Sequence, residues 1–152
     1  MGCFSAKLRV WNPVNPERAE ELELMVDTGA AYSWIARARL EPMGVQAVRK
    51  MQFRTIEGRV IERDLAPVFV ATDGYSGGDN VVMAEPGDME VLGSHTLESL
   101  GVTVDPLNKK LVSAGVSLAL MAVAERKGRV RPSITHLGME TCPSLSRRRT
   151  SG

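Results

Sequence analysis

The chain has 152 residues, of which 43% are hydrophobic and 24% are charged, and its formal net charge is +1. A chain of this length and composition can bury one hydrophobic core, so we expect a soluble globular protein with one main domain. The small net charge does not favour a nucleic-acid binder, and the longest apolar run, residues 116–124, is too short to span a bilayer.

Residues 1–115 consist of short apolar segments separated by turn residues. One short helix is predicted for residues 37–43, and a second is predicted from Ser94, as its N-cap, to Gly101. Residues 72–80 are predicted to form a glycine-rich loop. Strands are predicted for residues 7–11, 22–26, 33–35, 48–55, 59–71, 81–84, 90–93, 102–104 and 110–113. Many short strands with at most two short helices are typical of an all-β barrel.

The C-terminal part of the chain has a different composition. Residues 116–127 form an apolar extension whose periodicity does not distinguish a helix from a strand. Residues 128–152 have few apolar side chains and include an arginine triplet at positions 147–149. This composition predicts a basic, flexible tail. No aromatic stacking residues accompany the triplet, so we expect neither a nucleic-acid partner nor a membrane partner.

Cysteine and histidine are both scarce. The cysteines, Cys3 and Cys142, lie near opposite ends of the chain, and the histidines, His95 and His136, have no partner at metal-ligand spacing. Two cysteines do not make a disulfide scaffold, and the N-terminus shows no apolar signal segment. We therefore expect a cytoplasmic protein with no metal and no other cofactor, in which each histidine lies at the surface or caps a helix.

An acid follows directly on an apolar strand in LMVDTGAAYS, residues 24–33. Asp27 comes after three apolar residues and precedes Thr28, Gly29 and two alanines. Three interpretations are open for a carboxylate in this position: a phosphate-binding turn like that of actin-like ATPases, a structural aspartate bound to nearby N–H groups, or a protease loop. The first needs two large α/β domains, which 152 residues of β-type pattern do not supply.

The small residues around the acid suit catalysis by a carboxylate. Asp27 supplies the carboxylate, and the Thr28 hydroxyl can hold the loop by hydrogen bonding. Gly29 lets a ligand approach the backbone closely, because it has no Cβ. Ala30 and Ala31 leave room for a substrate chain.

Residues 22–113 resemble the retropepsin-like aspartic proteases, and look closest to their small bacterial members. The segment LMVDTGAAYSWI is similar to the active-site loop, FRTIEGRVIERDLAPVFV to the flap hairpin, and MEVLGSHTLESLGVTVDPLNKKLV to the apolar-apolar-glycine segment, short helix and last strands. The resemblance implies an all-β acid-protease barrel with one or two short helices, built from residues 1–115, with one half-site per chain. Retroviral members have an arginine soon after the late glycine, whereas Ser94 and His95 follow Gly93 here, so their dimer contacts are not implied.

The resemblance also implies which residues act on a peptide or protein substrate. A catalytic carboxylate lies in a supporting loop, a flap closes over the substrate, and a short apolar segment forms the active-site floor. In this sequence these residues are Asp27 as the catalytic group, Thr28, Gly29 and Ala30 in the loop, Ile56, Glu57, Gly58 and Arg59 in the flap, and Val91, Leu92 and Gly93 in the floor.

Aspartic proteolysis uses two carboxylates that share a proton, but the chain contains one Asp-Thr-Gly. The other aspartates lack this context and are expected to be solvated charges at turns or strand edges: Asp64, Asp73, Asp79, Asp88 and Asp105. The second carboxylate is therefore expected from a second copy, across the twofold axis of a homodimer. Residues 110–113 are a candidate strand for that interface.

The expected function is thus a homodimeric aspartic endopeptidase in which two Asp27 carboxylates activate a water molecule. Two alternatives stay open. In the first, the chain is a retropepsin-like binding or scaffold module with little proteolytic activity. In the second, it is an inactive β-domain in which Asp27 is purely structural.

Overall fold

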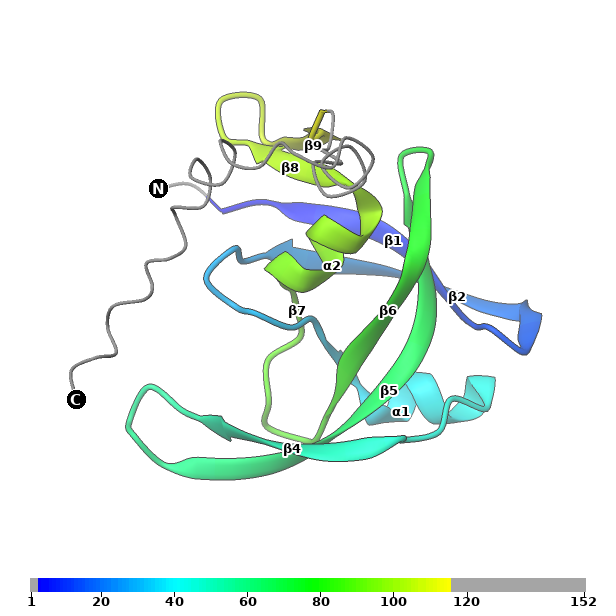
Figure 1. Ribbon diagram of the computed structural model, residues 1–152, viewed down its shortest axis with the longest axis vertical. Helices are drawn as coiled ribbons and strands as arrows, with labels where there is room; N and C mark the ends of the chain where they lie inside the picture. The colour runs from blue at the N-terminus through cyan, green and yellow to red at the C-terminus, as the bar shows by residue number, and fades with distance from the viewer. Residues whose placement is uncertain (1–2, 116–152) are drawn as a thin grey trace, which may run out of the picture. The chain divides into compact units, whose positions relative to one another are not determined.

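Alternating apolar and polar side chains build the strands of this protein. The structure, a computed structural model, describes residues 3–115, which are mostly β-strand with two short α-helices (Figure 1). In β1 (Ser5–Asn12) the side chains of Ala6, Leu8 and Val10 are buried, while those of Ser5, Lys7 and Arg9 are exposed. Successive side chains of a strand point to opposite faces, so this alternation places one face of β1 against the core.

Eight further strands follow β1 along the chain. They are β2 (Asn15–Val26), β3 (Trp34–Ala36), β4 (Arg49–Arg54), β5 (Val60–Thr72), β6 (Tyr75–Ala84), β7 (Val91–Leu92), β8 (Val102–Asp105) and β9 (Lys110–Ser113). The helices are α1 (Arg37–Leu40), which continues into a 3-10 turn, η1 (Glu41–Met43), and α2 (Ser94–Leu100).

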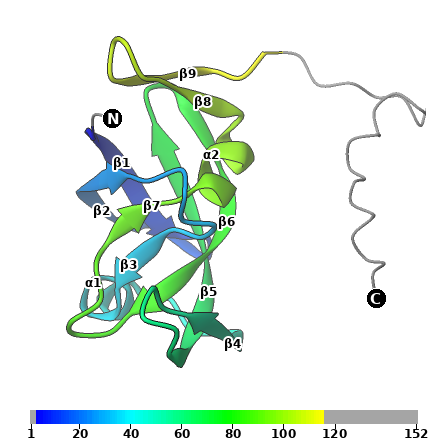
Figure 2. The ribbon, with the colours of Figure 1, turned by 90° about the vertical axis from the view of Figure 1, so that its left-hand side faces the viewer.

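The strand pairings form a closed circuit. One seven-stranded sheet has the order β1-β2-β7-β3-β6-β5-β4, and β5 also pairs with β1. Six strands therefore make a ring, and β4 extends from it as the outer strand of the β4–β5 hairpin. The pairings β2–β7 and β3–β6 are parallel, and Figure 2 shows β7 between β2 and β3. Strands β8 and β9 form a separate antiparallel pair.

The core joins the ring to helix α2. Leu24 from β2, Leu92 from β7 and Leu97 from α2 belong to one buried cluster. Leu24 lies near the end of β2, shortly before Asp27, and Leu92 is one of the predicted floor residues, so the core anchors both segments. The predicted all-β class with short helices is confirmed.

Most predicted elements are present, but the prediction of a glycine-rich loop at residues 72–80 is wrong. Strand β6 begins at Tyr75 and pairs with β5 from Tyr75 to Val82, including Val70 with Gly77 and Phe69 with Gly78. The Phe69 ring covers Gly78, because a Cβ on that glycine would lie 3.4 Å from Cε1 of Phe69. A neighbouring aromatic ring thus supplies the packing that the glycines lack.

Smaller differences have local causes. The helix predicted for residues 37–43 divides into α1 and η1, and Pro42 lies in the first turn of η1. Proline has no backbone N–H and interrupts the α-helical hydrogen bonds. Strand β2 begins at Asn15 rather than at residue 22, because it pairs with the whole of β1.

The apolar extension predicted for residues 116–127 and the basic tail predicted for 128–152 lie outside the described residues, as do His136 and Cys142. Between residues 3 and 115, no helix combines the length and the apolar character needed to cross a membrane.

We expect Leu24→Ala to lower the free energy of unfolding by about 2–5 kcal/mol, because it leaves a cavity in the core. Leu24 is 2% exposed, whereas Leu107 is 90% exposed and serves as the control. Leu107→Ala should change stability by less than about 0.5 kcal/mol. Urea denaturation of both variants measures the difference, and equal effects would contradict the assignment of Leu24 to the core.

Candidate active site

The Asp27 loop crosses the end of strand β7. Strand β7 lies between β2 and β3, so residues 27–33, which connect β2 to β3, must pass over it (Figure 2). The parallel register pairs Met25 with Val91 and Val26 with Leu92. The N–H of Asp27 continues this ladder with a hydrogen bond of 2.9 Å to the carbonyl of Leu92. Asp27 therefore lies where the strand pairing ends and the chain turns.

The loop orients one oxygen of the Asp27 carboxylate. The N–H of Gly29 donates to Oδ1 at 2.9 Å, and the N–H of Ala30 donates to the Asp27 carbonyl at 3.0 Å. A Cβ on Gly29 would lie 3.2 Å from the same Oδ1, so glycine allows this close approach. Oδ2 has no hydrogen-bond partner among residues 3–115, and Asp27, Thr28 and Gly29 are exposed in the single chain. The carboxylate is thus held in place with one oxygen left open.

Helix α2 clamps the other half of the loop. The N–H of Ser94 donates to the carbonyl of Ala30, and the N–H of His95 to the carbonyl of Ala31, both at 2.8 Å. The first N–H groups of a helix have no partner within the helix, and here the loop carbonyls satisfy two of them. The prediction that Ser94 caps α2 is wrong, because Gly93 occupies the N-cap position and no side chain caps the helix.

Gly93 packs directly against the loop backbone. A Cβ on Gly93 would overlap the carbonyl group of Tyr32 and would lie 2.8 Å from the carbonyl oxygen of Ala30. Backbone atoms cannot move aside as a side chain can, so glycine is required here. The structure thus brings the predicted floor residues Val91, Leu92 and Gly93 together with the predicted loop. The side chains of Val91 and Leu92 are buried.

The predicted flap residues form the tip of the β4–β5 hairpin. Residues Ile56, Glu57, Gly58 and Arg59 make the turn, which is closed by a hydrogen bond of 2.8 Å from the N–H of Thr55 to the carbonyl of Arg59. Gly58 has a φ of +94°, which favours glycine. Ile56 is fully exposed. A hydrogen bond from the Thr55 hydroxyl is the main cause that lowers the pKa of Glu57.

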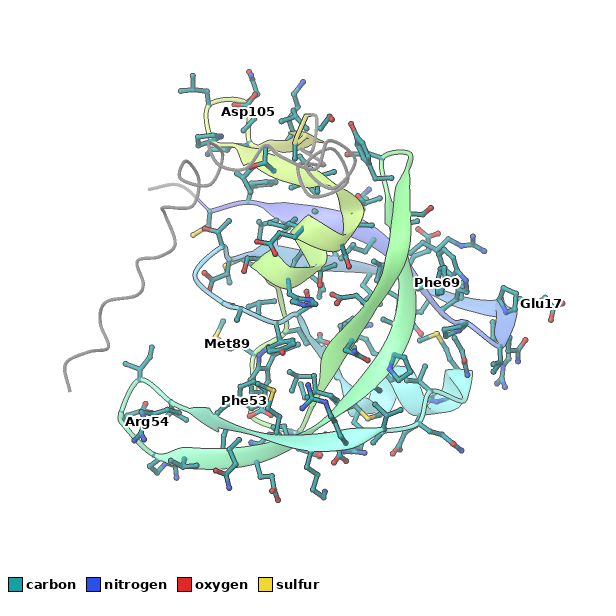
Figure 3. All side chains as sticks on the ribbon, viewed as in Figure 1. Glu17, Phe53, Arg54, Phe69, Met89 and Asp105 are labelled. Atoms are coloured by element: carbon teal, nitrogen blue, oxygen red, sulfur yellow. The ribbon has the colours of Figure 1, made fainter. Side chains whose placement is uncertain are left out.

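The hairpin tip lies apart from Asp27 in the single chain. No hydrogen bond joins the two segments within the described residues, but both point to the same side of the ring (Figures 1 and 2). One arm of the hairpin does reach the loop. The Phe53 ring on β4 (Figure 3) forms a T-shaped pair with Tyr32 at 6.1 Å and a tilted pair with Trp34 at 5.1 Å, measured between ring centroids. These aromatic contacts tie the hairpin arm to the site.

An apolar hollow of about 590 Å³ lies beside Asp27. Its lining combines the N-terminal segment, the end of β2 and strand β8: Cys3, Phe4, Met25, Val26, Asp27, Thr28, Thr103, Val104 and Pro106. Strand β9, the predicted interface strand, pairs with β8 and does not line the hollow. One side of the acid is therefore bordered by apolar surface that residues 3–115 leave uncovered.

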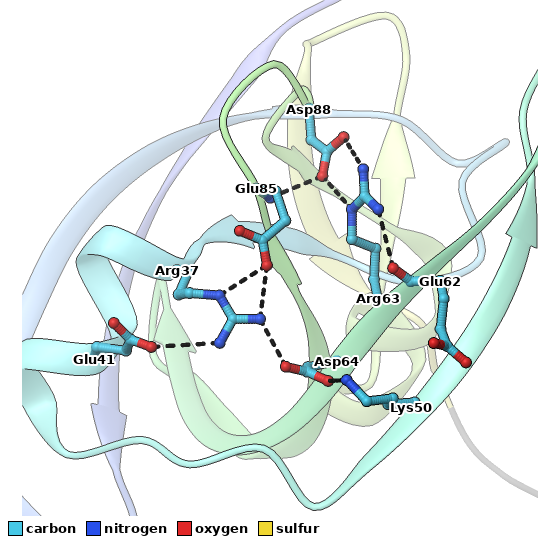
Figure 4. Close-up of polar contacts among 8 residues, drawn as sticks. All are labelled: Arg37, Glu41, Lys50, Glu62, Arg63, Asp64, Glu85 and Asp88. Carbon is cyan, nitrogen blue, oxygen red and sulfur yellow. Dashed lines mark hydrogen bonds and ion pairs between the residues drawn. The ribbon is translucent and has the colours of Figure 1, made fainter.

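An ionic network anchors the base of the hairpin (Figure 4). Arg37 of α1 binds Asp64 of β5 and Glu85 of the β6–β7 loop, both at 2.7 Å. Arg63 of β5 holds Asp88 with two hydrogen bonds of 2.7 and 2.9 Å. The hairpin is thus tied to the segment that precedes the floor strand β7.

Two aspartates of this network were predicted to be solvated, and that prediction is wrong. The side chains of Asp64 and Asp88 are 16% and 14% exposed. The hydrogen bond from Arg37 lowers the pKa of Asp64, and that from Arg63 lowers the pKa of Asp88. Their partners are distant in sequence, so spacing does not predict the pairs. Asp73, in the β5–β6 turn, is exposed as predicted.

Asp79 is the largest departure from the sequence prediction. Its side chain is completely buried, although it was expected to be a solvated charge. It accepts hydrogen bonds from Thr96 Oγ1 at 2.5 Å and from the N–H of Asn80 at 2.8 Å, and it contacts His95 Nδ1 at 2.7 Å. The alternation of exposed and buried side chains along β6 is the signal that could have found it, because Asp79 lies two residues before the buried Val81, on the same face of the strand. Assigning this segment to a loop hid that alternation.

Sequence reasoning missed Ser33 and Thr96 as well, and both are buried next to the loop. His95 lies in the first turn of α2 with 52% of its side chain exposed, which agrees with the predicted surface position. Residues 3–115 contain no cluster of three or more His, Cys, Asp or Glu side chains that could hold a metal ion.

No protein-family model matches the sequence, and no curated protein matches it either. The site is therefore interpreted from its own geometry.

We expect Gly93→Ala to destabilise the protein by about 3 kcal/mol or more, because its Cβ overlaps loop backbone that cannot yield. Gly78→Ala is the control, since its Cβ meets only the Phe69 ring, at 3.4 Å. The control should lose no more than about 1 kcal/mol. Urea denaturation compares the two variants, and a fully stable Gly93→Ala would show that the loop does not require this close approach.

Low pH should weaken the ionic contacts that hold the base of the β4–β5 hairpin. The folded-state pKa of Asp88 is lowered from its ordinary value of 3.8, so the stability it contributes is present above that value and is lost as pH falls through the folded pKa. Asp88→Asn should cost about 1–2 kcal/mol at pH 7 and flatten the fall in stability between pH 5 and pH 2.5. Urea unfolding midpoints across this pH range measure the change in stability, and Asp73→Asn serves as the control. Parallel curves for wild type and Asp88→Asn would contradict the assignment.

Proposed function

We propose that the chain is a retropepsin-like aspartic endopeptidase that acts as a homodimer. The observation that carries this proposal is the state of Asp27. Its carboxylate is oriented by the N–H of Gly29, keeps one oxygen open, and belongs to a loop clamped by α2. An aspartate with a purely structural role would be expected to use both oxygens for hydrogen bonds within the fold.

The proposed homodimer is supported by the chemistry of the reaction and by the surface around the acid. Peptide hydrolysis by aspartate needs two carboxylates, and the chain has one Asp-Thr-Gly. The hollow beside Asp27 exposes apolar groups of Phe4, Val26 and Val104. A second copy related by a twofold axis would cover this surface and bring its own Asp27 to the first, which completes the site.

In the proposed reaction a water molecule lies between the two carboxylates. One Asp27 takes a proton from the water as it attacks the peptide carbonyl, and the other, which is protonated, donates a hydrogen bond to the carbonyl oxygen. The tetrahedral intermediate then collapses with cleavage of the C–N bond, and the leaving amine receives the proton that the first Asp27 took from water. Exclusion of bulk water by the dimer would strengthen these interactions. The residues of the proposed mechanism need no metal or other cofactor.

The β4–β5 hairpin is the proposed flap over the substrate. Ile56 is fully exposed at the tip, and Met89, just before the floor strand, is 66% exposed. A peptide bound between them would bury both side chains, and the ionic contacts at the hairpin base would keep that end of the arm in place while the tip moves. The small number of cysteines fits a reducing compartment, so we propose the cytoplasm as the location.

Asp27→Asn should abolish cleavage of denatured casein, lowering kcat by about 10³-fold or more, because an amide cannot take the proton from water. The matched control is Asp73→Asn, which changes an exposed turn aspartate and should keep activity within about twofold of wild type. Cleavage is followed by mass spectrometry between pH 4 and pH 7. Light scattering measures the mass of each variant in solution.

The outcomes separate the alternatives. Cleavage that persists in Asp27→Asn would overturn the catalytic role, and cleavage by a monomer would overturn the shared site. If wild type and Asp27→Asn are both inactive while the dimer is intact, the chain is a binding or scaffold module with this loop retained.

A further inference from the structure

A chain of buried hydrogen bonds leads from Gly93 to Asp79. The N–H of Gly93 donates to Ser33 Oγ at 2.8 Å, Ser33 Oγ lies 2.6 Å from Thr96 Oγ1, and Thr96 Oγ1 donates to Asp79 Oδ2 at 2.5 Å. Ser33 and Thr96 are each 1% exposed, and the Asp79 side chain is fully buried. Water therefore does not compete for these groups.

The chemistry of the end groups gives this chain one direction. Thr96 Oγ1 donates to Asp79 Oδ2, so the single hydroxyl proton of Thr96 points to Asp79. Thr96 then has no proton for Ser33, and Ser33 must donate to Thr96. Ser33 Oγ in turn accepts from the N–H of Gly93. Every donor along the chain thus points toward Asp79.

Burying the Asp79 carboxylate costs free energy, which indicates a role that a neutral side chain at this position could not fill. Among the described residues its only basic contact is His95, and no lysine or arginine pairs with it. A buried carboxylate without a strong counter-ion is costly, and neutral side chains could fill the same space. An asparagine could not do the same work, because its amide has one acceptor oxygen, whereas donors approach both oxygens of Asp79.

The chain ends where α2 holds the Asp27 loop. Three consecutive N–H groups, those of Gly93, Ser94 and His95, bind Ser33 Oγ and the carbonyls of Ala30 and Ala31. The first of these bonds depends on the orientation of the Ser33 hydroxyl. We propose that Asp79 is a positioning residue, whose buried carboxylate sets the direction of the Thr96–Ser33 hydrogen bonds and thereby holds the Asp27 loop against Gly93.

The same arrangement determines the tautomer of His95. Its Nδ1 lies 2.7 Å from Asp79 Oδ1, so the neutral ring carries its proton on Nδ1 and leaves Nε2 as an acceptor. The ring also stacks on Tyr32, with centroids 5.3 Å apart. The tautomer therefore reports on the Asp79 contact without any enzyme assay.

Asp79→Asn tests the proposal in the full-length chain. Imidazole ¹⁵N NMR at pH 8 should find the His95 proton on Nδ1 in wild type, and the variant should lose this preference. Hydrogen exchange of the Gly93 amide should become at least about tenfold faster in the variant, because the Ser33 acceptor is no longer oriented.

A second set of variants keeps the test valid if Asp79→Asn does not fold. Thr96→Val breaks the chain, whereas Thr96→Ser keeps the hydroxyl and should restore wild-type exchange at Gly93. The matched control is Thr72→Val, which removes another buried hydroxyl, one that donates to the carbonyl of Lys7 at 2.7 Å. Thr72→Val should leave exchange at Gly93 unchanged.

The kinetic readout alone rests on the proposed function. Thr96→Val should lower kcat about 10- to 100-fold with KM within about twofold, since a displaced Asp27 loses rate more than binding. If wild type has no protease activity, the proposed function fails, and the tautomer and exchange data still decide the positioning role. A His95 proton on Nε2 in wild type would overturn the proposal. Equal exchange at Gly93 in Thr96→Val and Thr72→Val would overturn it as well.

Discussion

The close approach of Gly93 to the Asp27 loop is the constraint on which the rest of the site depends. Strand β7 lies between β2 and β3, so the connection between those strands must cross it. The crossing leaves no room for a Cβ, and the backbones meet through the N–H groups at the start of α2. A helix end that needs acceptors and a loop that offers carbonyls satisfy each other. The first part of the loop is thereby fixed by backbone atoms, while the side chains of Asp27 and Thr28 stay exposed.

Three kinds of contact then hold the surroundings of this crossing. Leucines of β2, β7 and α2 form the core beneath it, and the aromatic rings of Tyr32 and Phe53 link the loop to the hairpin arm. Ionic pairs fix the base of the same hairpin, where Arg63 holds Asp88. Within residues 3–115, no contact of these kinds reaches the open oxygen of Asp27. The contrast between a well-supported loop and an exposed acid is what one half of a shared site would require.

Local patterns in the sequence predicted the elements but not the polar contacts between them. The hairpin around Gly58 was predicted within about one residue, because alternation and a turn glycine are local signals. Residues 77 and 78 looked like a loop, since nothing nearby in sequence shows that Phe69 covers the second glycine. Asp79 was misjudged for the same reason, because its partners Thr96 and His95 come from helix α2, which follows only after strand β7. Long-range partners decide whether an aspartate is buried, and spacing does not reveal them.

The sequence by itself determined the β-rich class, the position of the hairpin and the conspicuous acid at the end of β2. These follow from side-chain periodicity and turn chemistry, which act over a few residues. Only the tertiary structure decided that Gly93 lies against the Asp27 loop, that Asp79 is buried beneath it, and that an apolar hollow borders the acid. Each of these depends on which strands become neighbours, and strand order is set by the packing of the whole core rather than by any local segment.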